Sequence, residues 1–444
     1  MTETLLMFFS VIHWVKSHFT LWDFAMALLG LFFFTCIHER VTKKGPMLWP
    51  VLGITPSLFL HLNDVFDWVT KALIKAEGTF HFRGFSMGGA FGIVTVDPSN
   101  VEYMLKTNFN NFPKGIYYRE RFYDLLGDGI FNADDELWKK QRQLAKLNMH
   151  SSRFIEHSFQ SMQCVIHQKL LKLFENLANS GHCFDLQEVL LRLTFDNICT
   201  AALGVDPGCL ALDNFRQEVL FAKAFEQATE LTLLRFLIPP FIFKPLMFFR
   251  IGYEKRLKKA TEIVHDFADK TVRDRRNKLD KLGNLNDQSD LLSRLMETQI
   301  NFPGKFFRDF CISFILAGRD TTSVALAWFF WLLHKNPDVE TKILDEIYEI
   351  LGHNRHDIVF TVEELKKMVY LEAALSESLR LYPSVPIELK QVLKDDVFPD
   401  GTRVKKVKVA DGQSVVPKLT TTLYMKNGLM VTLKPRLVEN NNGS

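Results

Sequence analysis

The residues best placed to do chemistry lie in the middle of a long apolar segment. Residues 310–337 read FCISFILAGRDTTSVALAWFFWLLHKNP, and small and polar residues interrupt the apolar run at its centre. Ala317 and Gly318 leave little side-chain bulk, while Asp320 and Thr321 bring an acid and a hydroxyl beside that gap. Apolar walls, one gap and a proton-relay pair favour chemistry that needs dry surroundings and a controlled supply of protons.

The same segment predicts one long helix, because Pro303 and Pro337 bracket it. A membrane span is the alternative, but Arg319 and Asp320 at its centre would each cost roughly 2.5–3.5 kcal/mol on insertion scales. We therefore expect a helix buried inside protein, with space for something flat or large against its backbone. Hydroxyls at its centre can also bond back to carbonyls of the previous turn.

Two further pairs have a spacing that places their side chains on one helix face. Trp138 and Arg142 stand four apart, so an indole and a guanidinium can reach a carboxylate-bearing cofactor. The alternative for this pair is an ordinary amphipathic helix. Glu377 and Arg380 stand three apart within residues 361–386 and can form an ion pair. The alternative for that E-x-x-R pair is a solvated surface pair.

The pentapeptide GFSMG, residues 84–88, matches the G-x-S-x-G nucleophile elbow of serine hydrolases. That mechanism needs a strand, a sharp turn and then a helix. The residues that follow, AFGIVTVDP, are strand formers, so we expect Ser86 in a hairpin turn. A serine hydrolase that acts through Ser86 is an alternative function for this chain.

Composition and charge exclude some classes of protein. The 444 residues carry a net charge of +3 and no helix with a basic stripe, so we expect no nucleic-acid partner. The 40 phenylalanines indicate a large apolar core, an apolar ligand cavity or membrane contact. None of the six cysteines forms a C-x-x-C pair, so we expect neither a zinc ribbon nor a redox motif. Their spread is typical of reduced thiols in a cytosol-facing domain.

The N-terminal part predicts a membrane anchor. Residues 19–37 read FTLWDFAMALLGLFFFTCI, which is close to the length that spans a bilayer. No signal-peptide cleavage site follows. Arg40, Lys43 and Lys44 come next, so the C-terminal flank should face the cytosol. A buried helix is the alternative. Residues 43–56 are rich in proline and predict a stiff elbow.

The chain as a whole predicts a mainly α fold with small β-sheets. Helical periodicity dominates residues 101–383, and strand-like segments lie before and after them. Residues 235–250 are apolar but contain three prolines, which favours a surface loop that dips into the bilayer over a core loop. We expect an anchor over residues 1–45 and a single catalytic domain over residues 46–444.

Taken in order, these motifs carry a family resemblance. The anchor, the elbow, W-x-x-x-R, A-G-x-D-T-T and E-x-x-R before L-Y-P together resemble the cytochrome P-450 superfamily of haem-thiolate monooxygenases over nearly the whole chain. Within it, the sequence resembles the plant branch of long- and very-long-chain fatty acid ω-hydroxylases. The segments that carry this finer likeness are residues 112–138, 193–199, 314–333 and 418–436.

The resemblance assigns roles to the residues singled out above. Trp138 and Arg142 would contact a propionate of haem b. Asp320 and Thr321 would deliver protons to dioxygen, and Ala317 and Gly318 would leave room for it. Glu377 and Arg380 would be structural, acting through a third, more C-terminal arginine. The substrate channel would be lined by four further residues: Tyr117, Val385, Leu419 and Thr421.

The resemblance also implies partners and a location. The substrate would be a long-chain fatty acid hydroxylated at its terminal carbon, and an apolar channel suits an alkyl chain. Electrons would come from NADPH through a membrane-bound NADPH–cytochrome reductase. The protein would be anchored in the endoplasmic reticulum membrane by a single N-terminal span, with its catalytic domain in the cytosol.

One part of the family pattern is missing from this sequence. The chemistry needs an axial cysteine thiolate from an F-x-x-G-x-R-x-C-x-G loop, but no cysteine follows Cys311. Residues 398–407 resemble the family's usual β segment, and residues 411–425 resemble its final hairpin. The haem-loop block that should lie between them is deleted, as a skipped or mispredicted exon would do.

Another residue is a poor substitute for the missing thiolate. Cys311 lies six positions before Ala317 on the predicted long helix, and His353 and His356 lack a supporting loop. A catalytically inactive membrane protein that binds lipid or a partner is therefore the alternative function.

Overall fold

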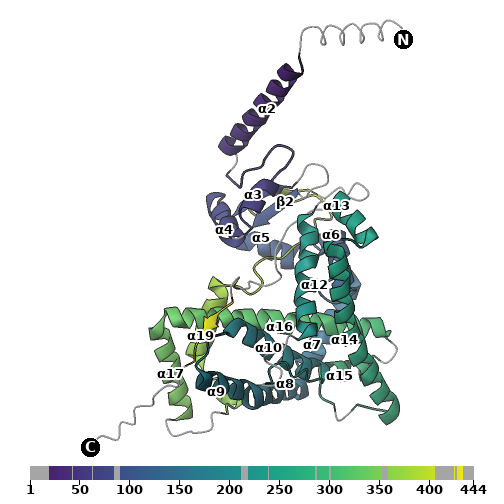
Figure 1. Cartoon of the computed structure of the whole chain (residues 1–444), viewed down its shortest axis with the longest axis vertical. Coiled ribbons are helices and arrows are strands. Elements are labelled where there is room, and N and C mark those ends of the chain that lie inside the picture. Colours follow the sequence, from purple (N-terminus) through teal and green to yellow (C-terminus); the bar gives the residue numbers. More distant parts are fainter. Residues whose placement is uncertain are drawn as a thin grey trace, which may run out of the picture. The chain divides into compact units, whose positions relative to one another are not determined.

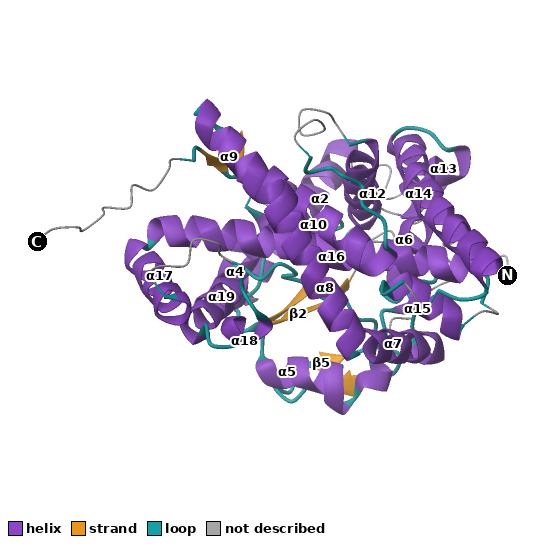
Figure 2. Cartoon of the chain, turned by 90° about the horizontal axis from the view of Figure 1, so that it is seen from below, coloured by secondary structure: helices purple, strands orange, loops and turns teal. Residues whose placement is uncertain are grey.

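The computed structural model describes residues 20–42, 44–62, 64–84, 91–211, 219–238, 240–285, 288–299, 302–352, 359–405, 425 and 428–433. Within these ranges the chain is mainly helical, with three small two-stranded sheets, which confirms the predicted fold class (Figures 1 and 2). Six residues named in the sequence predictions lie outside the described ranges: Lys43, Ser86, His353, His356, Leu419 and Thr421.

The chain divides into two compact units, which we describe separately. Unit 1 comprises Met1–Pro113, Phe236–Pro245 and Gln391–Pro417, and unit 2 comprises Lys114–Arg235, Leu246–Lys390 and Lys418–Ser444. Two helices include residues of both units, α12 (Leu220–Leu237) and α13 (Pro240–Phe249). The single catalytic domain expected over residues 46–444 stays a prediction.

Unit 1 holds short helices and two of the sheets. Its helices are α2 (Leu21–Thr42), α3 (Thr55–Leu60), α4 (Val65–Lys75) and α5 (Pro98–Glu102), followed by a π-helical turn (Tyr103–Thr107) and a 3-10 turn (Phe109–Asn111). Its strands are β1 (Thr79–Arg83), β2 (Phe91–Thr95), β4 (Asp396–Val397) and β5 (Arg403–Val404). Both sheets are antiparallel, with Thr79 opposite Thr95 and Asp396 opposite Val404.

Polar contacts hold the β4–β5 hairpin to the helices of unit 1. Asp396 accepts hydrogen bonds from the hydroxyl of Tyr103 at 3.1 Å and from the amides of Asn108 at 2.8 Å and Asn111 at 3.0 Å. Beneath it, the rings of Phe112 and Phe398 pack with Val404 in a small buried core.

The N-terminal helix α2 has the length and composition of a membrane span. Residues Trp22–Thr42 have a mean hydropathy of 1.5, and only 6% of the segment is buried. The same criteria select α16 (Gly304–Lys335), but 67% of that segment is buried inside the protein. The burial of α16 agrees with the prediction of a core helix in place of a second span.

Unit 2 is built around α16, which packs mainly against α10 (Leu186–Ile198) and α14 (Tyr253–Leu282) (Figure 2). Its other helices are α6 (Gly115–Leu126), α7 (Asp135–Met149), α8 (Ser152–Val165), α9 (Leu171–Ser180), α15 (Leu291–Thr298), α17 (Pro337–Leu351), α18 (Val362–Leu365) and α19 (Val369–Leu381). Two π-helical turns, Ile166–Leu170 and Cys199–Leu203, extend α8 and α10.

The sheet of unit 2 joins distant parts of the chain. Strand β3 (Phe184–Asp185) pairs antiparallel with β6 (Met430–Val431), with Phe184 opposite Val431. The two flanks of the expected deletion thus belong to different sheets, because β5 precedes it and β6 follows it. The junction itself, at residues 407–411, lies outside the described ranges.

Candidate active site

The polar centre of α16 contains a buried ion pair. A guanidinium nitrogen of Arg319 lies 2.8 Å from a carboxylate oxygen of Asp320, and each side chain is only 3% exposed. The guanidinium also lies 5.8 Å from the centre of the Phe225 ring on α12. Asp320, the acid proposed from the sequence as a proton donor, is therefore held by its own neighbour in a dry environment.

Hydroxyl groups bond back to the backbone of α16 in the same turn, as the sequence suggested. The hydroxyl of Thr321 donates to the carbonyl of Ala317 at 2.6 Å, and that of Ser323 donates to the carbonyl of Arg319 at 2.8 Å. A third donor comes from α10, since the Thr194 hydroxyl reaches the Arg319 carbonyl at 2.8 Å. Such extra bonds compete with the helical ladder and bend helices.

Gly318 serves close helix packing. A Cβ atom added there would lie 2.5 Å from Cγ1 of Ile198, which is tighter than any ordinary contact. The side of Gly318 where a Cβ would point is therefore filled by Ile198 of α10, and the expectation that Gly318 leaves room over a cofactor stays a prediction. Ala317 is half-buried and remains the candidate for open space on this turn.

Trp138 and Arg142 lie one turn apart on α7, as their spacing predicted. The indole is half-buried and the guanidinium side chain is exposed. The Nζ atom of Lys114 lies 5.8 Å from the centre of the Trp138 ring and donates to the carbonyl of Ala133 at 3.1 Å. Burial lowers the pKa of Lys114, although Asp134 opposes that shift. The sequence reasoning missed Lys114 as a neighbour of Trp138.

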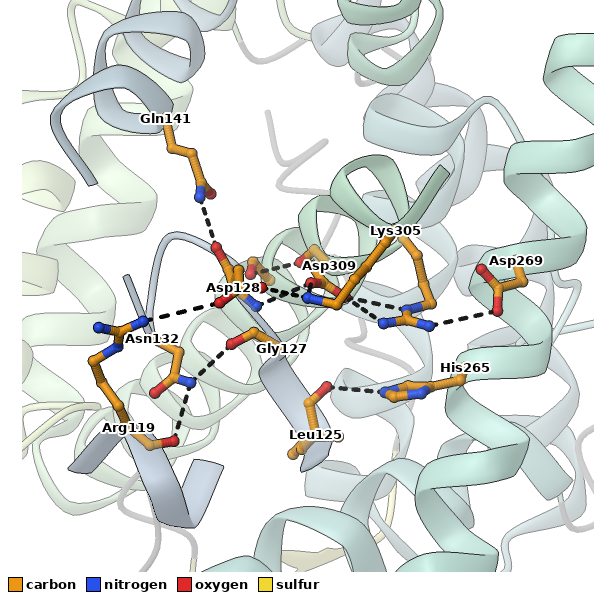
Figure 3. Close-up of polar contacts among 12 residues, drawn as sticks. Arg119, Leu125, Gly127, Asp128, Asn132, Gln141, His265, Asp269, Lys305 and Asp309 are labelled. Carbon is orange, nitrogen blue, oxygen red and sulfur yellow. Dashed lines mark hydrogen bonds and ion pairs between the residues drawn. The ribbon is translucent and has the colours of Figure 1, made fainter. Parts of the chain in front are cut away.

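A network centred on Asp309 of α16 fixes the loop between α6 and α7 (Figure 3). The Asp309 carboxylate accepts from the backbone N–H of Asp128 at 2.9 Å and from the side chains of Arg308 at 2.9 Å and Lys305 at 3.1 Å. Lys305 also pairs with the Asp128 carboxylate. Gly127 has a φ of +52° and abuts Asp309, so no other residue fits there without strain.

Further bonds tie this loop to its neighbours (Figure 3). The Gln141 amide of α7 donates to the Asp128 carbonyl at 2.7 Å, and the buried Asn132 amide donates to the Gly127 carbonyl at 2.8 Å. On α14, the His265 ring lies 3.3 Å from the Leu125 carbonyl, and burial lowers the pKa of His265. The start of α7, which carries Trp138, is thus fixed against α16 within unit 2.

Glu377 and Arg380 form the ion pair that their spacing predicted. Two parallel hydrogen bonds of 2.7 Å join the guanidinium to the carboxylate. The side chains are 55% and 67% exposed, so the geometry matches the surface-pair alternative. Bonding to Arg380 lowers the pKa of Glu377. The third arginine that the family pattern requires would come from the haem-loop block.

Two of the predicted channel residues, Tyr117 and Val385, lie in the described part of unit 2. The Tyr117 ring on α6 is half-buried, and the Arg121 guanidinium stacks on it at 3.5 Å. Burial raises the pKa of the Tyr117 hydroxyl. Val385 follows α19 and is 50% exposed. The structure does not bring Val385 against Tyr117 by any described contact, so their shared channel role stays a prediction.

Three cysteines of the described ranges are deeply buried. Burial raises the pKa of Cys199 and Cys311 well above the usual value and that of Cys209 to about 12, and each is at most 1% exposed. Cys164 and Cys183 are exposed. The described residues also form no group of three His, Cys, Asp or Glu side chains that could hold a metal ion.

Comparison with known proteins identifies the family. The family model for cytochrome P450 matches residues 44–424. The chain is 48% identical to cytochrome P450 86B1 of Arabidopsis thaliana over 395 residues, a match that covers 85% of this chain and 70% of that protein. It is 40% identical to cytochrome P450 94A1 of Vicia sativa over 366 residues, which are 81% of this chain and 68% of that protein.

A solved structure has the same fold. The crystal structure of the cytochrome P450DA heme domain superposes with a TM-score of 0.66 at 22% identity, covering 84% of this chain and 75% of that one. The chain belongs to the cytochrome P450 family of haem monooxygenases, and the plant relatives named above are members of its 86 and 94 groups.

The haem that the family implies is only partly matched by the residues present. Trp138 and Arg142 lie on α7 and the polar turn lies on α16, all within unit 2, and their contact with a haem stays a prediction. The family's thiolate loop is missing from the sequence, because no cysteine follows Cys311, and Cys311 itself is fully buried on α16. The donor set therefore does not fit a haem-thiolate centre in this chain.

Proposed function

We propose that this sequence derives from an enzyme that inserts one oxygen atom of dioxygen into the terminal C–H bond of a long-chain fatty acid. The observation that carries the proposal is the similarity to the plant fatty-acid hydroxylase branch over 85% of the chain. Apolar helix α2 supports a membrane anchor, which suits a substrate that partitions into lipid. We further propose an endoplasmic reticulum location and electron supply from an NADPH–cytochrome reductase.

The roles of individual residues in that activity belong to the same proposal. Trp138 and Arg142 would bind a haem propionate, and Asp320 and Thr321 would hold and pass protons. Thr321 is suited to this because its hydroxyl is already oriented by the Ala317 carbonyl. Tyr117, Val385, Leu419 and Thr421 would line the fatty acid channel.

We propose that the 444-residue form itself is catalytically inactive and retains only lipid or partner binding. The specific observation that favours this second function is the absence of a suitable cysteine. Cys311 is fully buried on α16 and does not lie in a loop that could present its sulfur as the axial ligand that this chemistry needs. The solvated Glu377–Arg380 pair is consistent with the loss of a covering block.

The absorption spectrum of the purified chain tests these proposals. We expect little co-purified haem and no thiolate-type Soret band after reduction and addition of carbon monoxide. A normal thiolate band would contradict the inactive-form proposal. Displacement of a fluorescent fatty acid by unlabelled long-chain fatty acids tests lipid binding separately. Transcript sequencing across the codons for Val404–Gln413 would show whether the deletion exists in the messenger RNA.

The ω-hydroxylase proposal needs the complete enzyme for its own test. A chain with the haem-loop block of a relative inserted between Val407 and Asp411 should regain the thiolate band and hydroxylate the terminal carbon of a long-chain fatty acid. Products oxidised only at internal carbons would contradict terminal hydroxylation while leaving the family assignment intact.

A further inference from the structure

A polar cavity is lined in part by Arg319, one member of the buried ion pair of α16. Its volume is about 220 Å³, it is partly open to solvent, and its walls come from α10, α12, α16 and the segment around Cys209. At about 30 Å³ per molecule, a space of this size holds several waters. Five charged residues line it: Glu188, Arg192, Lys223, Glu226 and Arg319.

The charged groups around the cavity are not equivalent. Glu188 pairs with Arg192 at 2.8 Å on α10, and Arg319 pairs with Asp320 at 2.8 Å on α16. Glu226, on the exposed side of α12, faces the cavity from one turn beyond Lys223. Glu226 and Arg319 therefore line the same cavity, and Asp320 pairs with Arg319 outside the lining; Glu226 is exposed, whereas Asp320 is buried.

The electrostatic influences on Glu226 agree with this geometry. Burial raises the pKa of Glu226, the Arg319 charge lowers it, and the charges of Glu230, Glu188 and Asp320 raise it. The interaction with Asp320 is mutual, since each carboxylate makes the other harder to ionise.

We infer that Glu226 is a positioning residue for Asp320 and acts through Arg319. When Glu226 is ionised, it attracts the guanidinium toward the cavity and weakens the hold of Arg319 on Asp320. The Asp320 carboxylate then accepts a proton more readily, and cavity water can supply one. Without Glu226, the Arg319–Asp320 pair of 2.8 Å would keep Asp320 ionised.

This inference deepens the proposed function, because it rests on the proton-holding role proposed for Asp320. It gives the enzyme a controlled proton supply from the α12 side. The experiment that tests it measures the protonation of the Asp320 carboxyl group in the 444-residue chain. The result of that experiment does not depend on haem binding or on fatty acid oxidation, which the spectral and product tests above address.

The experiment is an infrared pH titration of the 444-residue chain carrying ¹³C-labelled aspartate carboxyls. Asp320→Asn identifies the Asp320 band by its loss. In Glu226→Gln, the ratio of protonated to ionised Asp320 at a fixed pH should fall about threefold, as expected from the loss of one charge across a hydrated cavity. Glu230→Gln is the matched control, since Glu230 lies on the same helix but not in the cavity lining.

The outcomes separate the inference from a purely structural role. An unchanged ratio in Glu226→Gln overturns it, and so does an equal change in Glu230→Gln. Asp320 that stays ionised at every pH at which the chain is folded also overturns it. If Glu226→Gln lowers the midpoint of thermal unfolding, Glu226→Asp provides the second variant, and it should leave the ratio close to that of the parent chain.

Discussion

Arg319 and Asp320 are sequence neighbours whose side chains form an ion pair inside the protein, with 2.8 Å between the nitrogen and oxygen atoms. Adjacent residues of a helix point about 100° apart, so such a pair needs a guanidinium that folds back along the helix. The cost of burying both charges is offset only while both partners are present.

Loss of one member of this pair should therefore be severe. Arg319→Met removes the positive charge that lies 2.8 Å from the buried Asp320 carboxylate and should destabilise the chain by about 3–5 kcal/mol at neutral pH. Denaturant unfolding measures the change. The double variant Arg319→Met/Asp320→Asn removes both charges and should recover most of the loss. A double variant as unstable as the single one would show that packing, and not charge, is responsible.

Gly318 should tolerate no side chain because Ile198 of α10 fills the space beside it. Gly318→Ala places a methyl group 2.5 Å from Ile198 and should cost about 1–3 kcal/mol by overpacking. Adding Ile198→Ala makes room, so the two changes together should cost less than the sum of their separate effects. Gly304→Ala is the control, since its nearest neighbour would be 3.9 Å away.

The contact of Gly127 with Asp309 can be separated from the effect of backbone conformation alone. Gly127→Ala and Gly252→Ala both place a side chain at nearly the same backbone angles, φ +52° and ψ −129° against φ +61° and ψ −132°, but only the first meets another residue. Gly252→Ala should cost about 1–3 kcal/mol for the backbone conformation alone, and Gly127→Ala clearly more. Thermal unfolding and the hydrogen exchange of residues 126–134 would measure both. Equal costs would mean that Asp309 moves aside freely.

His265 should make stability depend on pH. Burial lowers the pKa of His265 in the folded state below its usual 6.5, so the unfolded chain binds a proton more readily. The neutral His265 ring contributes to the stability of the fold above pH 6.5, the usual pKa of histidine. That contribution is lost as the pH falls below 6.5 toward the lower pKa of the folded state. His265→Gln keeps a donor for the Leu125 carbonyl and should flatten that part of the pH profile. His182→Gln, at an exposed position, should leave the profile unchanged.

Periodicity and helix-ending residues predicted the frame of the fold well. Pro303 and Pro337 bracketed the long helix, and α16 runs from Gly304 to Lys335 between them. Within residues 361–386, Thr361 and Glu364 form a capping box, which begins a separate helix of four residues before α19. A local pattern fixes where a helix starts, whereas its end depends on packing that the pattern does not contain.

The candidate site was predicted less completely, because its partners are distant in the chain. The helical spacing of Glu377 and Arg380 predicted their contact, since both lie on one face. The bond between Asp128 and Asp309 joins residues 181 positions apart, and no periodicity signals it. The Gly-Asp-Gly run at residues 127–129 is the one local signal, because a glycine at positive φ often marks a close approach. The packing of Ile198 against Gly318 was likewise hidden from sequence.

The pairing of β5 and β6 with different strands has a consequence for repair of the chain. Residues outside 406–424 set the register of both sheets, Asp396 opposite Val404 and Phe184 opposite Val431. Additional chain between them would leave either pairing unaltered, and the entropic cost of a longer connection grows only with the logarithm of its length. A longer segment can therefore be inserted between β5 and β6 without a change in the register of either sheet.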